Sequence, residues 1–273
     1  MKLIFLGTGT AFTTRDFNYH SNILLEKNNT ERLLIDCGSD VRFSLAELGL
    51  NYTHVTDIYI SHLHTDHVGG LEWVGFNRKF DKKMSKSRLY LHENIYELIW
   101  QHTLSGGMAS VQGQIPTLET FFDVTKIKNN AGFIWQDIEF RLVQTVHAMN
   151  GFVLIPSYGL YFNVNGKNIF ITTDTQFCPT LYDYFYQSAD LIFHDCETKA
   201  QPSGVHTHYN QLIQLPPAIK AKMWLYHYSS ANLPDVSQNG FKGFVTKGQV
   251  FELNKPGTYQ SDVREIIKSI RKS

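Results

Sequence analysis

The sequence has few cysteines, no excess of charge of either sign and no long hydrophobic run. Its three cysteines, Cys37, Cys178 and Cys196, are odd in number and lack zinc-finger spacing, which argues against a disulfide framework or a thiolate zinc site. We therefore expect reduced thiols and a cytoplasmic protein. The 25 basic residues balance the 25 acidic ones, whereas a protein that grips long stretches of nucleic acid usually carries a basic surplus. This balance weighs lightly against a large RNA partner.

The sequence also lacks the long apolar segments that membrane insertion or secretion would require. No apolar run approaches the roughly 20 residues that a membrane span requires, so we expect no membrane partner. The apolar stretch at residues 2–6 is shorter than a signal peptide and runs directly into a glycine turn, which predicts a first strand. No segment rich in glycine, proline or serine divides the chain, and residues 1–273 are expected to form a single domain.

Apolar periodicity and turn residues predict strands and helices along most of the chain. The predicted strands lie at residues 2–6, 21–26, 31–36, 55–60, 133–135, 138–146, 159–164, 168–172, 191–194 and 223–227, the last being the final core strand. The predicted helices lie at residues 40–48, 71–77, 94–102 and 262–273. The interval 70–118 is mixed and aromatic, with the helices at 71–77 and 94–102 as its predicted elements, and a second strand-rich half begins near Thr120. Two such halves, with their sheets packed face to face and their helices outside, form an α/β protein of the αββα sandwich type.

The strongest motif is His62-x-His64-x-Asp66-His67, which directly follows a predicted strand. Imidazole and carboxylate are the ligands that zinc, manganese and iron prefer when a site must stay open to water. Four such residues within six positions direct their side chains at one region from a single loop. The motif therefore predicts a metal site at the end of this strand.

This motif resembles the signature of the metallo-β-lactamase superfamily. The resemblance implies three further ligands, each at the end of a later strand, and His147, Asp174 and His227 stand at such positions. It implies two divalent metal ions, with zinc expected and manganese or iron as alternatives. The implied ligands are His62, His64 and His147 at the first ion, Asp66, His67 and His227 at the second, and Asp174 as the bridge between them. Asp66 is also counted among the catalytic residues. A bridging aspartate is typical of the phosphodiesterase, glyoxalase and tRNase Z branches, not of β-lactamases.

Three segments narrow the resemblance to the tRNase Z-like branch. Residues 5–10, Phe-Leu-Gly-Thr-Gly-Thr, resemble that branch's opening strand and turn. Residues 189–196 resemble its strand that ends in His-Glu, with Asp195 in place of the glutamate, and residues 204–208 resemble its later His-Ser/Thr motif. By this resemblance His206 is the general acid that protonates the leaving oxygen, and Asp195 orients it. His208 is the alternative general acid.

The arm with which bacterial tRNase Z enzymes usually grip RNA has no room at its usual place in this chain. It stands between the third histidine and the bridging aspartate, and the interval from His147 to Asp174 is too short for one. Together with the zero net charge, this favours a small phosphodiester over a folded RNA. The chain is therefore similar to the anti-Pycsar phosphodiesterases of phages and bacteria, which look like arm-less tRNase Z enzymes and hydrolyse cyclic nucleotides to linear monophosphates.

This resemblance implies an activity and leaves two alternatives open. A hydroxide that bridges two ions about 3.5–4 Å apart would attack the phosphorus of a cyclic nucleotide and yield a linear nucleoside monophosphate, in evasion of anti-phage defence. The alternatives are a tRNA 3′-processing endonuclease and a non-catalytic protein that sequesters a nucleotide. A small nucleotide is the expected partner, and the branch's members are commonly homodimers. The candidates to stack on the base are Trp73, Phe76, Phe80, Tyr158 and Tyr161.

Overall fold

The computed structural model describes residues 1–14, 18–28, 30–129, 131–229 and 232–254. The chain forms two compact units, each with its own β-sheet. The first unit contains Met1–Gly7, Tyr19–Asn129 and the segment that begins at Lys247, and the second contains Thr8–Asn18 and Asn130–Thr246. The single-domain organisation stays a prediction, and the helix predicted at 262–273 lies outside the described residues.

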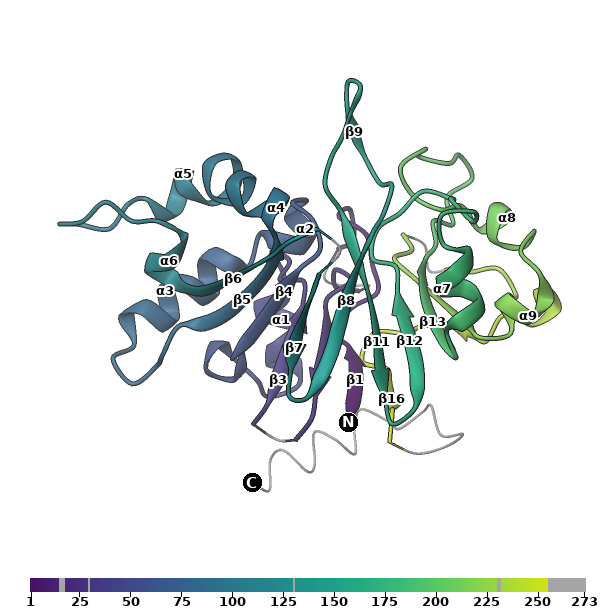
Figure 1. Cartoon of the computed structure of the whole chain (residues 1–273), viewed down its shortest axis with the longest axis horizontal. Helices are drawn as coiled ribbons and strands as arrows, with labels where there is room; N and C mark the ends of the chain where they lie inside the picture. The colour runs from purple at the N-terminus through teal and green to yellow at the C-terminus, as the bar shows by residue number, and fades with distance from the viewer. Residues whose placement is uncertain (15–17, 29, 130, 230–231, 255–273) are drawn as a thin grey trace. The chain divides into compact units, whose positions relative to one another are not determined.

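A seven-stranded mixed sheet forms the centre of the first unit (Figure 1). Its strands, in spatial order, are β16 (Val250–Glu252), β1 (Lys2–Phe5), β2 (Ile23–Glu26), β3 (Arg32–Ile35), β4 (Asp57–Ile60), β5 (Ser87–His92) and β6 (Phe122–Ile127). The strands from β16 to β3 pair antiparallel, whereas those from β3 to β6 pair parallel. The strands predicted at 21–26 and 31–36 are β2 and β3, which form an antiparallel hairpin with Leu24 opposite Leu34.

Helices connect the parallel strands of this sheet, because parallel neighbours need a crossover of a dozen or more residues. They are α1 (Val41–Glu47), the 3-10 helix η1 (Tyr52–His54), α2 (Thr65–Val68), α3 (Leu71–Phe80), α4 (Glu93–Leu98), the π-helix η2 (Ile99–Leu104), α5 (Ser105–Met108) and α6 (Leu118–Phe121). The helix predicted at 40–48 is confirmed as α1, and Gly49, at a φ of +73°, follows its end. Within the described ranges, no helix of either unit is both long enough and apolar enough to cross a membrane.

Part of this sheet differs from the prediction. β5 lies between the helices predicted at 71–77 and 94–102 and is not among the predicted strands; a lysine-rich segment precedes it where a turn signal would be expected. β6 belongs to this sheet and not to the second half; it is an edge strand with exposed polar side chains, which weaken its apolar pattern. β16 follows the strand predicted at 223–227, so that strand is not the last of the core. A three-residue strand that pairs with a distant partner leaves little local signal.

A second seven-stranded sheet forms the centre of the second unit. Its strands, in spatial order, are β15 (Gly243–Phe244), β14 (Met223–Tyr226), β13 (Leu191–Asp195), β12 (Lys167–Ile171), β11 (Tyr158–Val164), β8 (Ile138–Gln144) and β7 (Gly132–Trp135). Asn165 and Gly166 both have positive φ and form the tight turn between β11 and β12. β12, β13, β14 and β15 run parallel. Their carboxyl ends therefore meet at one edge of the sheet.

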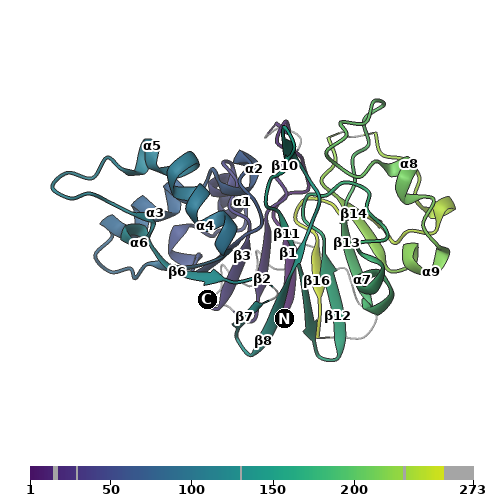
Figure 2. The same ribbon diagram turned by 45° about the horizontal axis from the view of Figure 1, so that its top comes forward.

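Short helices cover one face of this sheet beside its parallel strands (Figure 2). They are α7 (Asp183–Ser188), α8 (Tyr209–Leu212) and α9 (Pro217–Lys220), and the 3-10 helix η3 (Ser237–Asn239) follows later in the chain. Tyr186 of α7, Leu212 of α8 and Ile219 of α9 share a buried core with Phe170 of β12 and Leu225 of β14. A small hairpin of β9 (Met149–Asn150) and β10 (Val153–Leu154) fills part of the interval in which an arm would stand.

Candidate active site

The residues of the metal motif gather in the first unit, just beyond β4. His64 is the N-cap residue of α2, and Asp66 and His67 lie within that helix. His62 Nε2 lies 3.1 Å from His64 Nδ1, and His67 Nε2 lies 3.2 Å from Asp66 Oδ2. His62, Asp66 and His67 are buried. The structure thus brings the four predicted ligands together as two closely spaced pairs.

A carboxylate that the sequence analysis does not single out holds this cluster in place. Asp36 follows β3, the parallel neighbour of β4. Its Oδ2 accepts hydrogen bonds from His67 Nδ1 at 2.7 Å and from Ser61 Oγ at 2.8 Å, and Ser61 Oγ lies 3.0 Å from His62 Nδ1. A partner on Nδ1 fixes the tautomer and the orientation of a ligating imidazole and leaves Nε2 for the metal. The sequence does contain a signal for Asp36: like the predicted ligands, it is a polar residue of metal-site type just beyond the end of a strand.

We expect Asp36→Asn to lower metal affinity roughly 10- to 100-fold. The amide keeps the shape of the carboxylate, but it loses the negative charge on which the bonds from His67 and Ser61 converge. Competition with a chelating dye measures the affinity. Asp57→Asn is the matched control, because Asp57 is an equally buried carboxylate of β4 that pairs with Arg88; it should lower stability and leave metal affinity unchanged. Wild-type affinity in a folded Asp36→Asn protein would contradict the assignment.

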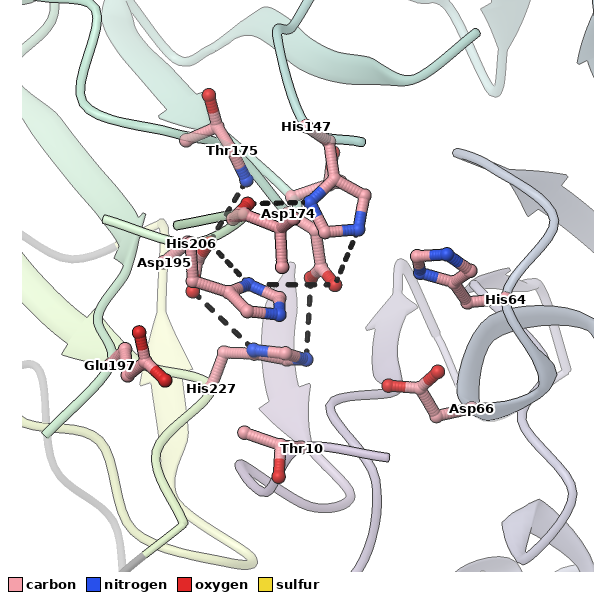
Figure 3. A network of polar contacts seen from close by, with 12 residues as sticks. Thr10, His64, Asp66, His147, Asp174, Thr175, Asp195, Glu197, His206 and His227 are labelled. Atoms are coloured by element: carbon pink, nitrogen blue, oxygen red, sulfur yellow. Dashed lines mark hydrogen bonds and ion pairs between the residues drawn. The ribbon is translucent and has the colours of Figure 1, made fainter. Parts of the chain in front are cut away.

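The other three predicted ligands lie beyond strand ends in the second unit (Figure 3). His147 follows β8, Asp174 follows β12 and His227 follows β14. Asp174 Oδ1 lies 3.3 Å from His227 Nε2, and Asp174 Oδ2 lies 3.7 Å from His147 Nε2. All three side chains are buried. One carboxylate therefore faces two imidazoles, an arrangement compatible with the bridging role predicted for it.

The spacings within each unit are those of atoms that share a metal ion. Four ligands placed tetrahedrally at about 2.0–2.1 Å from zinc stand about 3.3 Å from one another. The two pairs in the first unit, at 3.1 and 3.2 Å, match this spacing, as does the 3.3 Å between His227 and Asp174. Imidazole and carboxylate donors suit zinc, manganese and iron alike. The residues present therefore fit divalent metal ions.

The backbone is strained where these residues stand. Thr173, beside Asp174, has a φ of +53°, and His227 has a φ of +67°. In the first unit, Asp36 has a φ of +62°. A positive φ is an outlier for a β-branched residue, and each such conformation costs about 1–3 kcal/mol. Strain of this kind persists at functional sites because the surrounding structure holds the side chain where it is needed.

Asp195, which is buried, and His206, which is partly buried, form a pair beside Asp174. Asp195 ends β13, and its Oδ2 accepts a hydrogen bond from His206 Nδ1 at 2.9 Å. The other oxygen, Oδ1, lies 3.4 Å from His227 Nδ1. Asp174, Asp195, His206 and His227 place ligand-type atoms within 4.8 Å of one another. Asp195 thus contacts both a predicted ligand and the predicted proton donor.

This contact shifts the protonation of both partners. Burial acts to lower the pKa of His206, but the charge of Asp195 and the hydrogen bond to it outweigh burial and raise the pKa above its ordinary value. Burial acts to raise the pKa of Asp195, yet the charge and hydrogen bond of His206 lower it to about 2. The pair therefore favours an imidazolium beside an ionised carboxylate, the state that a general acid and its orienting partner require.

His208, the alternative general acid, is engaged in holding a helix. Its Nδ1 accepts a hydrogen bond from Asn210 N–H at 3.2 Å at the start of α8, and its Nε2 donates to the Lys199 carbonyl at 2.8 Å. Backbone groups therefore occupy both ring nitrogens. Of the two candidate general acids, His206 is the one whose ring lies beside Asp195 and Asp174.

His147 takes its orientation from the main chain. Its Nδ1 donates to the carbonyl of Val205 at 2.8 Å, one residue before His206. Burial lowers the pKa of His147 to about 4, against the opposing charge of Asp174. The imidazole is then neutral at physiological pH, which is the form that binds metal. Sequence reasoning missed this partner because a backbone carbonyl has no residue signature.

The five aromatic candidates for base stacking fall in different environments. Tyr158 is buried in the core and Phe80 is largely exposed. Tyr161 packs edge-on against Phe185 of α7, and its hydroxyl donates to Ser188. Trp73 and Phe76 line a cavity of about 440 Å³ in the first unit. These two remain candidates, whereas Tyr158 and Tyr161 have structural roles.

Comparison with known proteins places the chain in a family. The family model described as Anti-Pycsar protein Apyc1 matches residues 1–251. The chain belongs to this anti-Pycsar family. A relative of the same description from Paenibacillus harenae is 36% identical over 233 residues, which cover 84% of this chain and 90% of the relative. Another, from Bacillus phage vB_BveM-Goe7, is 30% identical over 258 residues, which cover 91% and 96% of the two chains. The predicted anti-Pycsar resemblance is confirmed.

Solved structures identify the fold. The metallo-β-lactamase fold protein YhfI from Bacillus subtilis superposes with a TM-score of 0.72 at 18% identity, over 92% of this chain and 99% of YhfI. The short form of human tRNase Z superposes with a TM-score of 0.65 at 17% identity, over 93% and 99%. At such identities the likeness shows the fold alone. The predicted α/β metallo-β-lactamase fold is confirmed, and with the His/Asp clusters it supports a metal-dependent hydrolase.

Proposed function

We propose that this anti-Pycsar family member hydrolyses cyclic nucleotides to linear nucleoside monophosphates with two divalent metal ions. The observation that carries the proposal is a His/Asp ligand set accompanied by a partly buried proton donor, His206, hydrogen-bonded to the buried Asp195. Such a donor is useful where the leaving group is an alkoxide of high pKa, as in a phosphodiester of ribose. The proposed ligands are His62, His64, Asp66, His67, His147, Asp174 and His227.

In this proposal the chain's own residues position and protonate the substrate. Divalent metal ions held by the proposed ligands would activate a water nucleophile and stabilise the charge that develops during an in-line displacement. Asp36 and Ser61 hold the rings of His67 and His62 in their ligating orientation. His206, kept protonated by Asp195, donates its proton to the leaving ribose oxygen as the ring of the cyclic nucleotide opens. Such a donor contributes roughly 10²–10⁴-fold to the rate.

The metal, assembly and setting are part of the same proposal. We propose zinc as the resident metal, a homodimer as the assembled form and the cytoplasm as the place of action, where the protein removes cyclic nucleotides that trigger anti-phage defence. Elemental analysis of purified protein identifies the metal. If the purified protein contained manganese or iron in stoichiometric amount, the assignment of zinc would be wrong and that metal would be the resident ion. A mass near 31.4 kDa in solution, that of one chain, would contradict the dimer.

A panel of cyclic nucleotides tests the proposed activity. Protein loaded with zinc or manganese is expected to convert at least one 3′,5′- or 2′,3′-cyclic nucleotide to its linear monophosphate, as resolved by chromatography. Bis-p-nitrophenyl phosphate serves as the control for general phosphodiesterase activity. Inertness toward the whole panel by protein that cleaves this control would sink the proposal. Cleavage of precursor tRNA after the discriminator base would favour the tRNA endonuclease, and tight binding without turnover would favour sequestration.

A further inference from the structure

Tyr182 lies where the backbone segments that carry two proposed ligands meet. It is the N-cap residue of α7 and is fully buried. Its hydroxyl oxygen accepts a hydrogen bond from Val146 N–H at 3.2 Å and lies 2.6 Å from Thr175 Oγ1. Val146 precedes His147, and Thr175 follows Asp174. One hydroxyl therefore contacts both segments, one residue away from each ligand.

Further hydrogen bonds close the same junction. Gln176 N–H donates to the Val146 carbonyl at 2.6 Å, and Gln176 Nε2 donates to the His147 carbonyl at 2.7 Å. Because the Tyr182 oxygen accepts from Val146 N–H, its own proton is available to Thr175 Oγ1. Burial raises the pKa of Tyr182 to about 12, so the hydroxyl keeps this proton at physiological pH.

The tyrosine ring is fixed by the core of the second unit. Its centroid lies 6.0 Å from that of Phe170 in β12 and 5.8 Å from that of Tyr186 in α7. Both neighbours are buried members of the core that α7 forms against the sheet. The place of the hydroxyl is therefore set by packed aromatic side chains, and the loops at the strand ends are tied to it.

We propose that Tyr182 is a positioning residue for the metal centre, whose hydroxyl sets the spacing between His147 and Asp174. This inference rests on the proposed function, since it takes both residues as metal ligands. Without the hydroxyl, Val146 N–H and Thr175 Oγ1 lose a buried partner. The 3.7 Å between His147 Nε2 and Asp174 Oδ2 is then less well fixed. Groups that orient ligands in this way change metal affinity about 10- to 100-fold.

Tyr182→Phe tests the inference, with Tyr186→Phe as its matched control. Tyr186 is a buried tyrosine of the same region, and its hydroxyl lies 2.7 Å from Nε2 of His194, which is not a proposed ligand. Affinity for Zn²⁺ and Mn²⁺ is measured by chelator competition without substrate, and unfolding of the metal-free proteins by urea. We expect Tyr182→Phe to weaken metal binding roughly 10- to 100-fold and Tyr186→Phe to leave it unchanged, although both lose a buried hydroxyl. Equal metal affinities in the two variants would overturn the inference.

A second pair of variants guards against a Tyr182→Phe protein that fails to fold. Thr175→Val removes the other partner of the hydroxyl, whereas Thr175→Ser keeps Oγ1. Weakened metal binding in Thr175→Val that Thr175→Ser restores supports the inference, and equal binding by both contradicts it. The metal readout separates this result from the activity. A wild-type protein that binds metal but hydrolyses no cyclic nucleotide refutes the proposed function alone, whereas one that binds no metal refutes both.

Discussion

Asp174→Ala is expected to abolish hydrolysis and to remove bound metal at the same time. Asp174 is buried, with carboxylate oxygens 3.3 Å from His227 Nε2 and 3.7 Å from His147 Nε2. Alanine leaves the two imidazoles without the anion between them, and the positive charge of the metal ions is no longer balanced there. We expect kcat/KM to fall by at least about 10³-fold, which corresponds to about 4 kcal/mol of transition-state stabilisation.

Elemental analysis of dialysed protein, together with kinetics on bis-p-nitrophenyl phosphate and on a cyclic nucleotide, measures both effects. Asp183→Ala is the control, because Asp183 is an acidic residue in the first turn of α7 in the same unit and is not a proposed ligand. It should keep metal and activity. Full metal content in Asp174→Ala would exclude this residue as a bridging ligand, even if activity were lost.

His206→Ala is expected to keep the metal and to lower kcat on cyclic nucleotides roughly 10²–10⁴-fold. The loss should be much smaller on bis-p-nitrophenyl phosphate, because p-nitrophenolate leaves without a proton. The pH dependence provides a second readout. The pKa of His206 is raised by Asp195 and the donor works in its protonated form, so wild-type kcat should fall as pH rises through that pKa. This alkaline limb should be absent from the variant.

His208→Ala separates the proton donor from its neighbour. His208 holds the start of α8 through Asn210 N–H and the loop before it through the Lys199 carbonyl. Its removal should lower the free energy of unfolding by about 1 kcal/mol, the usual cost of a lost N-cap, and should not change how the rate depends on the leaving group. If His206→Ala left cyclic-nucleotide turnover unchanged while His208→Ala reduced it, the assignment of the general acid would be reversed.

The predicted ligands could be found from the sequence because each stands beyond the end of a strand. His147, Asp174 and His227 follow β8, β12 and β14. β12 and β14 run parallel on either side of β13, and β8 runs in the same direction because β8 and β12 are both antiparallel to β11. The carboxyl ends of the three strands therefore lie at one edge of the sheet, so local apolar runs already indicate where the polar residues after them meet. The same rule would have found Asp36 beyond β3. It was missed because an isolated acidic residue after a strand is common, whereas three histidines and an aspartate in one loop are not.

Other parts of the structure leave no local pattern. β16 pairs with β1 across most of the chain, and no periodicity within three residues reveals that pairing. Tyr182 is one of fourteen tyrosines, and only the fold shows that its hydroxyl contacts Val146 and Thr175. Long-range hydrogen bonds of this kind depend on tertiary packing, so they follow from the structure and not from the residue types.

The hydrogen bond from His147 to the Val205 carbonyl constrains the length of the loop before His206 more than its side chains. Every amino acid carries a carbonyl, so no point mutation at position 205 deletes this partner. Gain or loss of one residue between Glu197 and His206 would, however, shift the carbonyl out of register. The Glu197 carboxylate accepts a hydrogen bond from Ser203 N–H at 2.8 Å, which ties the start of this loop to its middle. We therefore expect the number of residues in this loop to be more constrained than the identity of most of its exposed side chains; Ser203 is the exception, because its Oγ donates to Glu197 and accepts from Val205 N–H. In an alignment of homologous sequences, we expect the segment from Glu197 to His206 to lack insertions and deletions even where its residues are not conserved.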